Sequence, residues 1–409
     1  MTIKRFWVIA FRDLIRNKRR TFLTLLAVTM GMMVLIMMSG FIAGVIADGL
    51  RENIRLNTGH IQLRDDTYEI EKLSLLSRDL LDDIEALTAQ AEALSEVQSA
   101  APVLWTSGVL STVRESTGLQ VTGIVPDDDF HAPVRDGMIA GEYLAADDRG
   151  QILLGERLAN DMGITVGERV SLTMGNADGQ VNEDIFTVAG LFNTGILSYD
   201  QNTVIMPLAQ AQAFTNSGNR ASSIIVMLND REDTAKVAAA LQGAGREVLT
   251  WENLNVLLLT LMDQAGVIYY ILYLIVILVV AVLIANTLLM SVFERTRELG
   301  ILASLGMKGR QLMLMVLFEA IILALMGVAI GLVLGAGFVT YMSGVGIQFS
   351  AEAMGSMQGV ALGSRLYPAF APGEAVTLSI LMFTIVSLVS LYPAWYAARL
   401  EPVKALHAL

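Results

Sequence analysis

The chain has 409 residues, of which 54% are hydrophobic and only 17% charged, and its net charge is −12. Soluble globular domains are about a quarter charged, so this composition argues against an ordinary soluble enzyme. The acidic balance argues against a nucleic-acid partner. The absence of cysteine excludes a disulfide framework and a thiolate metal site. The length is sufficient for two or three folding units.

Four stretches without a charged residue exceed the roughly 20 residues that a membrane-spanning helix needs. They are Thr21 to Ala47, Gln264 to Phe293, Ala320 to Ala351 and Ala375 to Ala398. From them we predict transmembrane helices at 21–47, 264–293, 311–343 and 374–398, with an outer loop at 344–373. A cleaved signal peptide is the alternative for the first stretch, but signal sequences have shorter apolar cores of about 7–15 residues.

Positive charge is distributed unevenly among the segments between these spans. Residues 1–20 carry seven Lys and Arg, the loop 294–310 carries four and the tail 399–409 carries two. The segment 48–263 has 14 basic and 33 acidic residues, a net charge of −19. Basic residues collect on the cytoplasmic side of membranes, so we predict cytoplasmic termini and an external domain at 48–263. Residues 1–20 are interpreted as an amphipathic helix on the inner leaflet or as a plain basic flank.

The external segment alternates between strand-like and helix-like patterns. Strands are predicted at His60–Leu63, Val103–Val113, Leu119–Val125, Gln151–Leu154, Arg169–Met174, Ile185–Ala189 and Ser223–Leu228, and helices at Leu80–Leu94, Glu156–Met162 and Thr234–Leu241. One α/β lobe would comprise 49–125 and 220–255, and a β-rich lobe would be inserted at 126–219. The predicted fold class is an α-helical membrane protein with four transmembrane helices and a large, two-lobed α/β extracytoplasmic domain.

Residue patterns for catalysis and metal binding are sparse. His60, His131 and His407 lack the spacing of metal ligands, and the acidic runs 127–129 and 147–148 are typical of solvated loops. The sequence contains no GxSxG or Ser-x-x-Lys nucleophile motif and no GxxxxGK[ST] phosphate loop. We therefore predict a non-catalytic chain that has no cofactor or metal of its own and cannot hydrolyse ATP by itself.

The segment after the second span, E-R-T-R-E-L-G-I-L-A-S-L-G at 294–306, begins with charges and continues with apolar residues. Such a segment is suited to a groove on a cytoplasmic partner, with charges at the rim and an apolar ridge in the middle. The alternative is a basic loop that only fixes the topology. The candidate coupling residues are Glu294, Arg295, Arg297, Glu298, Leu299, Gly300, Leu302, Leu305 and Gly306.

This segment resembles the cytoplasmic loop of ABC-transporter permeases of the MacB/FtsX superfamily, the type VII architecture. The sequence A-A-R-L-E-P-V-K-A-L at 397–406 is similar to one found across that superfamily. The preceding L-Y-P-A-W-Y-A-A at 391–398 is more similar to LolC/LolE-type permeases of lipoprotein-releasing systems. Residues 152–170 and 186–195 resemble the inserted lobe of the same permeases.

The resemblance implies a permease subunit in a bacterial inner membrane that works by mechanotransmission and releases lipoproteins toward the outer membrane. The implied partners are a cytoplasmic ABC ATPase dimer that binds ATP and Mg²⁺, a second permease chain that is identical or homologous, and a lipoprotein or other amphiphilic substrate. A MacB-like efflux permease for peptides or small molecules and an FtsX-like regulator of a cell-wall hydrolase are the alternatives. LolC-type permeases also recruit a periplasmic carrier through a proline-containing loop. The matching hairpin, Thr173–Asp184, is short and acidic and has no proline, which argues against carrier capture by this chain.

The first span places six apolar residues on one helical face, with Met38 beside them; they are Met30, Met33, Val34, Met37, Phe41 and Val45. Methionine-rich surfaces adapt to varied apolar ligands, and in the superfamily the first two spans line a central cavity. The candidate cavity residues are Met33, Met37, Met38, Phe41, Tyr269 and Tyr273. The alternatives are a lipid-facing or packing surface for the methionines and an interfacial aromatic belt for the tyrosines.

The third span contains Gly327, Gly331 and Gly335, a repeat that lets another helix approach closely, so we predict a role in helix packing. Glu319 is the only acidic residue inside a hydrophobic run. We expect it to pair with the basic loop, where Lys308 and Arg310 are close in sequence. A proton relay is the alternative.

Overall fold

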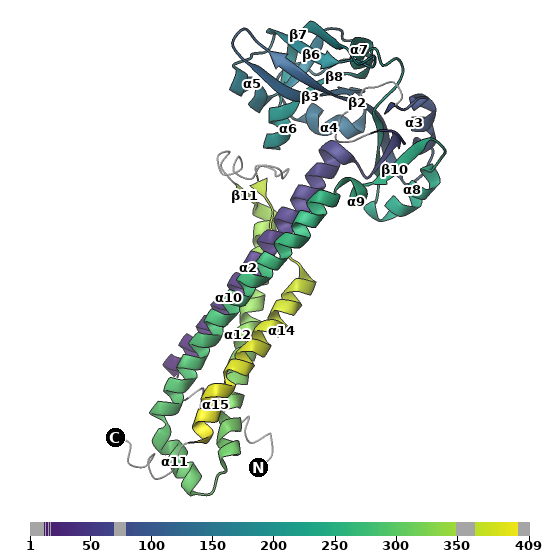
Figure 1. The fold of residues 1–409 in the computed structure, drawn as a ribbon. Coiled ribbons are helices and arrows are strands. Elements are labelled where there is room, and N and C mark those ends of the chain that lie inside the picture. Colours follow the sequence, from purple (N-terminus) through teal and green to yellow (C-terminus); the bar gives the residue numbers. More distant parts are fainter. Residues whose placement is uncertain are drawn as a thin grey trace. The chain divides into compact units, whose positions relative to one another are not determined.

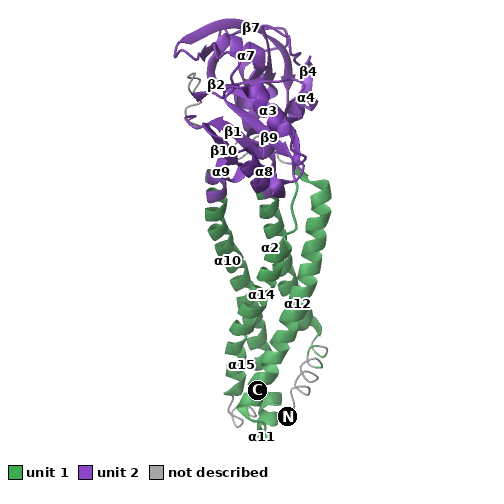
Figure 2. Cartoon of the chain, turned by 90° about the vertical axis from the view of Figure 1, so that its right-hand side faces the viewer, with its two compact units in different colours: residues 1–46, 261–347, 367–409 green, residues 47–260, 348–366 purple. Residues whose placement is uncertain are grey.

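The computed structural model describes residues 12, 14, 16, 18–68, 79–348 and 365–399, and the chain divides into two compact units (Figure 2). Unit 1 comprises Met1–Ile46, Leu261–Ile347 and Tyr367–Leu409, and unit 2 comprises Ala47–Thr260 and Gln348–Leu366. Within the described residues, four helical segments are long and apolar enough to cross a membrane. They are Lys18–Thr58, Leu258–Glu294, Gly309–Val345 and Pro372–Ala398. The predicted fold class, with four such helices and an α/β external domain, is confirmed.

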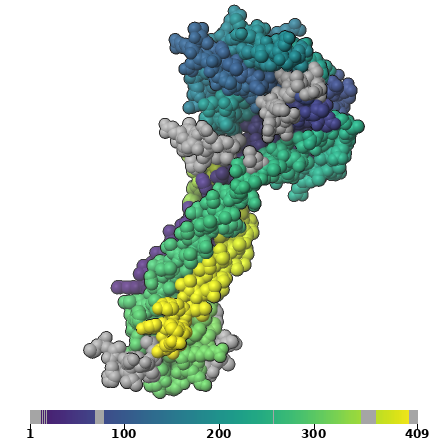
Figure 3. Space-filling model, viewed as in Figure 1, coloured from purple at the N-terminus to yellow at the C-terminus, as the bar shows by residue number. Residues whose placement is uncertain are grey.

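The four long helices of unit 1 are α2 (Lys18–Asn53), α10 (Val256–Glu294), α12 (Gly309–Val345) and α14 (Pro372–Val389) (Figure 1). α2 and α10 continue past the predicted outer limits at 47 and 264. In the space-filling view, α10 and α14 lie on the visible surface of this unit (Figure 3). Two short helices complete it, α11 (Thr296–Ser304) and α15 (Leu391–Ala398).

The predicted span 374–398 is divided into α14 and α15 at Ser390. Pro393 accounts for this break, because it has no N–H and its ring would collide with the carbonyl of Val389 in a continuous helix. The predicted N-terminal helix 1–20 lies largely outside the described residues. Leu14 is described, and it packs on Ile322 and Leu323 of α12. Most of the outer loop 344–373 and of the tail 399–409 also lies outside the described residues.

The glycine repeat of α12 forms the contact with α2. A Cβ atom added at any of the three glycines would come within 2.7 Å of an α2 side chain; the pairs are Gly327 with Val28, Gly331 with Met32 and Gly335 with Ile36. One step further the roles reverse, and a Cβ on Gly40 of α2 would lie 2.8 Å from Val339. The contact advances four residues on both helices at once, so α2 and α12 run parallel. Their beginnings therefore share one end of unit 1.

Unit 2 is built on a ten-stranded sheet with the order β10-β1-β9-β2-β3-β8-β5-β7-β4, in which β6 pairs with both β2 and β7. The strands are β1 (Ile61–Asp65), β2 (Val97–Ser111), β3 (Ser116–Ile124), β4 (Met138–Gly141), β5 (Gln151–Gly155), β6 (Arg169–Gly175), β7 (Val181–Phe192), β8 (Thr203–Pro207), β9 (Ser223–Leu228) and β10 (Arg246–Thr250). The main helices are α3 (Ile84–Glu92), α5 (Glu156–Met162), α6 (Leu197–Asn202), α7 (Leu208–Thr215) and α8 (Thr234–Leu241). Every strand and helix predicted in this segment has a counterpart, whereas β4, β8, β10, α6 and α7 were not predicted.

Six of these strands close into a ring. β2 pairs with β3, β3 with β8, β8 with β5, β5 with β7, β7 with β6, and β6 with β2. β2 serves both parts of the domain, because residues 97–103 pair with β9 and residues 104–111 pair with β3. The predicted lobe boundary between residues 125 and 126 is therefore wrong, since β3 belongs to the ring and the change of lobe occurs inside β2.

Helix packing in unit 1 can be tested by adding bulk at the α2–α12 contact. Replacing Gly331 with Val forces a branched side chain against Met32, and overpacking of this kind costs about 1–3 kcal/mol. Gly337 lies on the same helix with no atom within 4 Å of an added Cβ, so Gly337→Val is the matched control. We expect a lower thermal unfolding midpoint in detergent for Gly331→Val alone. Equal midpoints for the two variants would contradict the packing.

Candidate functional site

Six charged side chains meet at the end of unit 1 where α2 and α12 begin. We call them the ion network; its members are Arg16, Arg20, Glu294, Arg295, Glu298 and Glu319. They come from α2 and the residues just before it, from the junction between α10 and α11, from α11 and from α12. Three arginines and three glutamates make the group formally neutral. It joins the predicted coupling segment to two of the long helices.

The solvent-facing half of the network is centred on Glu298. Arg16 Nη2 donates to its two carboxylate oxygens at 2.7 and 2.6 Å, and Arg295 Nε lies 3.2 Å from Oε2. The hydrogen bond from Arg16 holds the pKa of the Glu298 carboxyl below its usual value. The side chains of Arg16 and Glu298 are 55% and 48% exposed, so solvent screens the pair and its net stabilisation is about 0–1 kcal/mol.

The buried half of the network is centred on Glu319, whose side chain is only 5% exposed. Arg20 Nη2 donates to Glu319 Oε1 at 2.7 Å, and Arg295 Nη1 lies 3.7 Å from Oε2. Glu294 lies further out, with 3.8 Å between its Oε2 atom and Arg20 Nη1. The expected partners of Glu319 are therefore corrected to Arg20 and Arg295. Lys308 and Arg310 lie more than two helical turns away along α12 and are exposed.

One face of α11 is packed inside unit 1. Leu299 is 2% exposed, and Leu302 packs against the same apolar cluster, which contains Val292, Leu312, Met315, Val316, Ala394 and Ala397. Gly300 is also buried. The prediction that Leu299 belongs to an exposed docking ridge is wrong, because its side chain holds α11 on α10, α12 and α15.

The opposite face of α11 points to solvent. It carries Arg297, Ile301 and Leu305, spaced four residues apart, and we call these three residues the outer face of α11. Ile301 is 45% exposed and Leu305 is 79% exposed. Gly306 follows with a φ of 95°, which ends the helix in a conformation that favours glycine. Of the candidate coupling residues, Arg297, Leu305 and Gly306 are thus exposed, together with the two glutamates of the network, Glu294 and Glu298.

The predicted cavity face of α2 lies on the outside of the four-helix unit. Met30 and Val34 are almost half exposed, while Met33, Met37 and Phe41 are half-buried. The opposite side of the helix carries the buried residues Met32, Leu35 and Ile36. This arrangement leaves a methionine-rich apolar face on α2 that no other described helix of the chain covers completely.

The remaining candidate cavity residues lie deeper. Met38 and Tyr269 pack against the central apolar cluster, and Tyr273 is completely buried within it. Tyr273 lies beside Ser39 and Glu374, which are joined by a 2.9 Å hydrogen bond. Its assignment as a residue lining an open cavity is wrong in this structure, because it faces the interior of the bundle.

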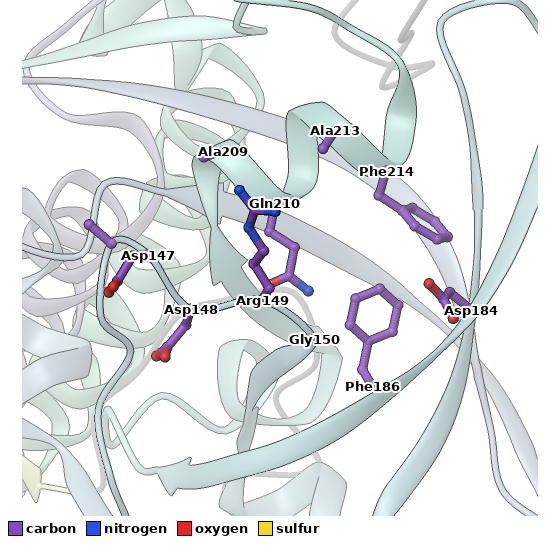
Figure 4. A pocket seen from close by; sticks show the side chains of 11 residues that line it. Asp147, Asp148, Arg149, Gly150, Asp184, Phe186, Ala209, Gln210, Ala213 and Phe214 are labelled. Carbon is purple, nitrogen blue, oxygen red and sulfur yellow. The ribbon is translucent and has the colours of Figure 1, made fainter.

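Unit 2 contains a cavity of about 530 Å³ between the loop 146–150, the start of β7 and α7 (Figure 4). Phe186 and Phe214 meet edge to face in it, with 5.4 Å between the ring centroids. Arg149, Gln210 and three aspartates supply its polar lining. The lining contains no nucleophile paired with a base, so nothing in it indicates catalysis.

No cluster of three or more His, Asp or Glu side chains suited to a metal ion occurs within the described ranges. His131 is 4% exposed and packs against Phe130, and burial lowers its pKa to about 3. It is therefore a neutral core residue. The other described histidine, His60, accepts a hydrogen bond from the backbone N–H of Leu228.

These features define a class of membrane protein: four apolar helices, an α/β domain inserted after the first, and a short helix between the second and third that presents a free face. Residues 21–244 match the MacB-like periplasmic core domain, and residues 270–402 match the FtsX-like permease C-terminal domain. The chain belongs to the MacB/FtsX family of ABC permeases.

Three relatives illustrate the range of this family. The lipoprotein-releasing system transmembrane protein LolC of Xylella fastidiosa is 22% identical over 338 residues, which cover 76% of this chain and 78% of the relative. LolE of Haemophilus influenzae is 23% identical over 373 residues, covering 80% and 87%. The macrolide export ATP-binding/permease protein MacB of Bdellovibrio bacteriovorus is 21% identical over 430 residues, covering 97% of this chain and 60% of that protein.

Sequence reasoning missed the roles of Arg16 and Arg20, which it treated only as topology signals. One signal could have found Arg20: a glutamate next to an apolar span needs a cation when it is buried. The parallel course of the first and third spans, which the predicted topology already implied, brings the N-terminal arginines to the beginning of α12.

The two faces of α11 can be separated by mutation. Leu299→Asp places an unpaired carboxylate in an apolar cluster, and burial of such a charge is strongly unfavourable. Leu305→Asp places the same group in solvent. We expect the Leu299 variant to lose yield and thermal stability, while the Leu305 variant matches the wild type. Similar losses in both variants would show that α11 packs differently.

Proposed function

We propose that this chain is the transmembrane subunit through which a cytoplasmic ABC ATPase dimer drives movement of the external domain, and that the complex releases lipoproteins from a bacterial inner membrane. The observation that carries the proposal is the outer face of α11. It presents Ile301 and Leu305, two large apolar side chains, to solvent beside Arg297. A small apolar centre with a charged rim is the composition of a protein–protein contact.

An ATPase partner would supply ATP hydrolysis, because these 409 residues contain no phosphate-binding loop; the MacB relatives are named as combined ATP-binding and permease proteins. ATP and Mg²⁺ would be bound by that partner. The opposite side of α11 supports the proposal, since Leu299 and the ion network hold the helix on α10, α12 and α2. A push on the outer face would therefore reach the long helices instead of bending a loose loop.

Two features favour a lipoprotein over other molecules as the substrate. LolC and LolE match this chain over most of their own lengths, 78% and 87%. The exposed face of α2 around Met33, Val34 and Met37 offers flexible apolar side chains against which an acyl chain can pack. A second permease chain, identical or homologous, would cover the outer part of this face and enclose a cavity. The β6–β7 hairpin has no proline, so a periplasmic carrier is not assigned to this chain.

Efflux of peptides or small molecules is the second candidate. The MacB relative of Bdellovibrio bacteriovorus matches 97% of this chain. Coupling through α11 would be the same for either substrate. The two functions differ in which molecule contacts the exposed face of α2.

The coupling role can be tested with Leu305→Glu. A charge at this position should disrupt an apolar contact with the ATPase. Co-purification of the ATPase and permease-dependent ATP hydrolysis should therefore both fall about tenfold or more. The matched control is Val113→Glu, because Val113 is also a solvent-exposed apolar residue but lies in the hairpin loop of the external domain. Wild-type binding and hydrolysis in the Leu305 variant would remove α11 from the mechanism.

The cargo can be identified by photo-crosslinking in proteoliposomes that contain the complex and a triacylated lipoprotein. A benzophenone amino acid at Val34 probes the exposed face of α2. The same probe at Val333, which is 70% exposed and lies between the two glycines that contact Met32 and Ile36, samples lipid at the same depth. We expect lipoprotein adducts that depend on ATP at Val34 and background adducts at Val333. Equal labelling at both sites would contradict lipoprotein release.

A further inference from the structure

We propose that Glu319 is the positioning residue that makes α11 move together with α2 and α12, so that displacement of the coupling helix is transmitted to the first span. This inference rests on the proposed function, since it concerns how a push on α11 is passed on. The observation behind it is a buried carboxylate that contacts cations from two other segments of the chain.

Glu319 and its two arginine partners lie on three different segments of unit 1. Arg295 occupies the junction between the last residue of α10 and the first residue of α11, so any rotation or shift of α11 displaces it. Arg20 lies in the first turn of α2. Glu319 lies ten residues into α12 and contacts both at once. One side chain therefore joins the coupling segment, the first span and the third span.

Burial makes this contact stronger than the exposed part of the network. The side chains of Arg20 and Arg295 are 17% and 11% exposed, against 55% for Arg16. Charge interactions are weakly screened where water is excluded, whereas an exposed pair adds little. The pair Arg16–Glu298 joins the residues just before α2 to α11, but it lies in solvent and is expected to open readily.

The Arg20–Glu319 pair lies in register with the glycine contacts between α2 and α12. Arg20 and Glu319 stand two four-residue steps before Val28 and Gly327, on the same line of contacts. Repeated glycines at a constant spacing do not by themselves fix which α2 residue meets which glycine. A shift by one turn would separate the buried Glu319 carboxylate from Arg20, and breaking a buried ion pair is strongly unfavourable. Glu319 thus fixes the register as well as the connection.

Removing the negative charge has a directional consequence. With Glu319→Gln, the two arginines keep their charges near each other, and the carboxylate that separates them is lost. Like charges at short range repel, so the α10–α11 junction should move away from the beginning of α2. The apolar packing of Leu299 and of Leu14 is untouched, and α11 should remain folded and able to bind the ATPase.

The test measures ATPase binding and permease-dependent ATP hydrolysis for the complex of the full chain with its ATPase. We expect the Glu319→Gln variant to bind the ATPase normally. Its permease-dependent ATP hydrolysis should fall about tenfold or more, a change within the usual range of coupling free energies. Glu115→Gln is the matched control, since Glu115 is exposed in the hairpin loop between β2 and β3 of the external domain, and it should behave as the wild type.

A rescue experiment separates transmission from simple stability. The chain has no cysteine, so Arg16→Cys with Glu298→Cys creates a single site for a short bismaleimide that ties α11 to α2. This tether should restore coupling in the Glu319→Gln background and leave coupling intact in the wild-type background. Should Glu319→Gln not fold, the neutral pair Arg20→Gln with Glu319→Gln carries the same comparison, because it leaves no charge from that pair uncompensated.

Two results would overturn the inference: normal coupling in the Glu319→Gln variant, or a loss of coupling that the tether does not restore. Failure of the proposed function is recognised separately. If Leu305→Glu binds and stimulates the ATPase as the wild type does, α11 is not the contact, whatever Glu319 does. If Leu305→Glu fails and Glu319→Gln is normal, only the role of Glu319 is refuted.

Discussion

The close parallel contact between α2 and α12 is the constraint on which the rest of unit 1 depends. Three glycines on α12 and one on α2 remove the side chains that would otherwise separate the two helices. In a membrane no hydrophobic driving force holds helices together, so such close packing and a few polar contacts supply the association. Here the polar contact is Arg20 with Glu319, at the same end as the predicted coupling segment. The glycine contacts and the ion pair therefore lie along the same side of α2, facing α12.

The connections to the external domain bring together α2 and α10. The chain passes from α2 through the π-helix Ile54–Thr58 into β1, and from β10 through a short helix into α10. β1 and β10 are antiparallel neighbours, with Ile61 opposite Thr250. Asn53 also donates a hydrogen bond to the side chain of Asn255, next to the beginning of α10. Unit 2 is thus entered and left through adjacent, mutually bonded segments.

Local patterns were enough to predict the spans and ten elements of the external domain, because period and length are properties of a short window. What failed depends on distant partners. β3 has a normal strand pattern, but its membership of the ring follows from pairing with β8, which lies about 80 residues further along the chain. Leu299 and Leu305 look alike in sequence, and only packing against α12 and α15 distinguishes them. Tyr273 was predicted to line a cavity, because the pattern does not show which side of a span faces its neighbours in the bundle.

α2 carries both a fixed face and an adaptable face. Its glycine-contact side is buried on α12, and the other side presents methionines to the surroundings of the unit. A helix of 36 residues held by backbone hydrogen bonds transmits displacement along its length better than any loop. The end that carries Arg20 and the face that carries Met33 and Met37 therefore move together. Under the proposed coupling, a displacement at α11 changes the apolar surface offered to an acyl chain without any chemical step in this subunit.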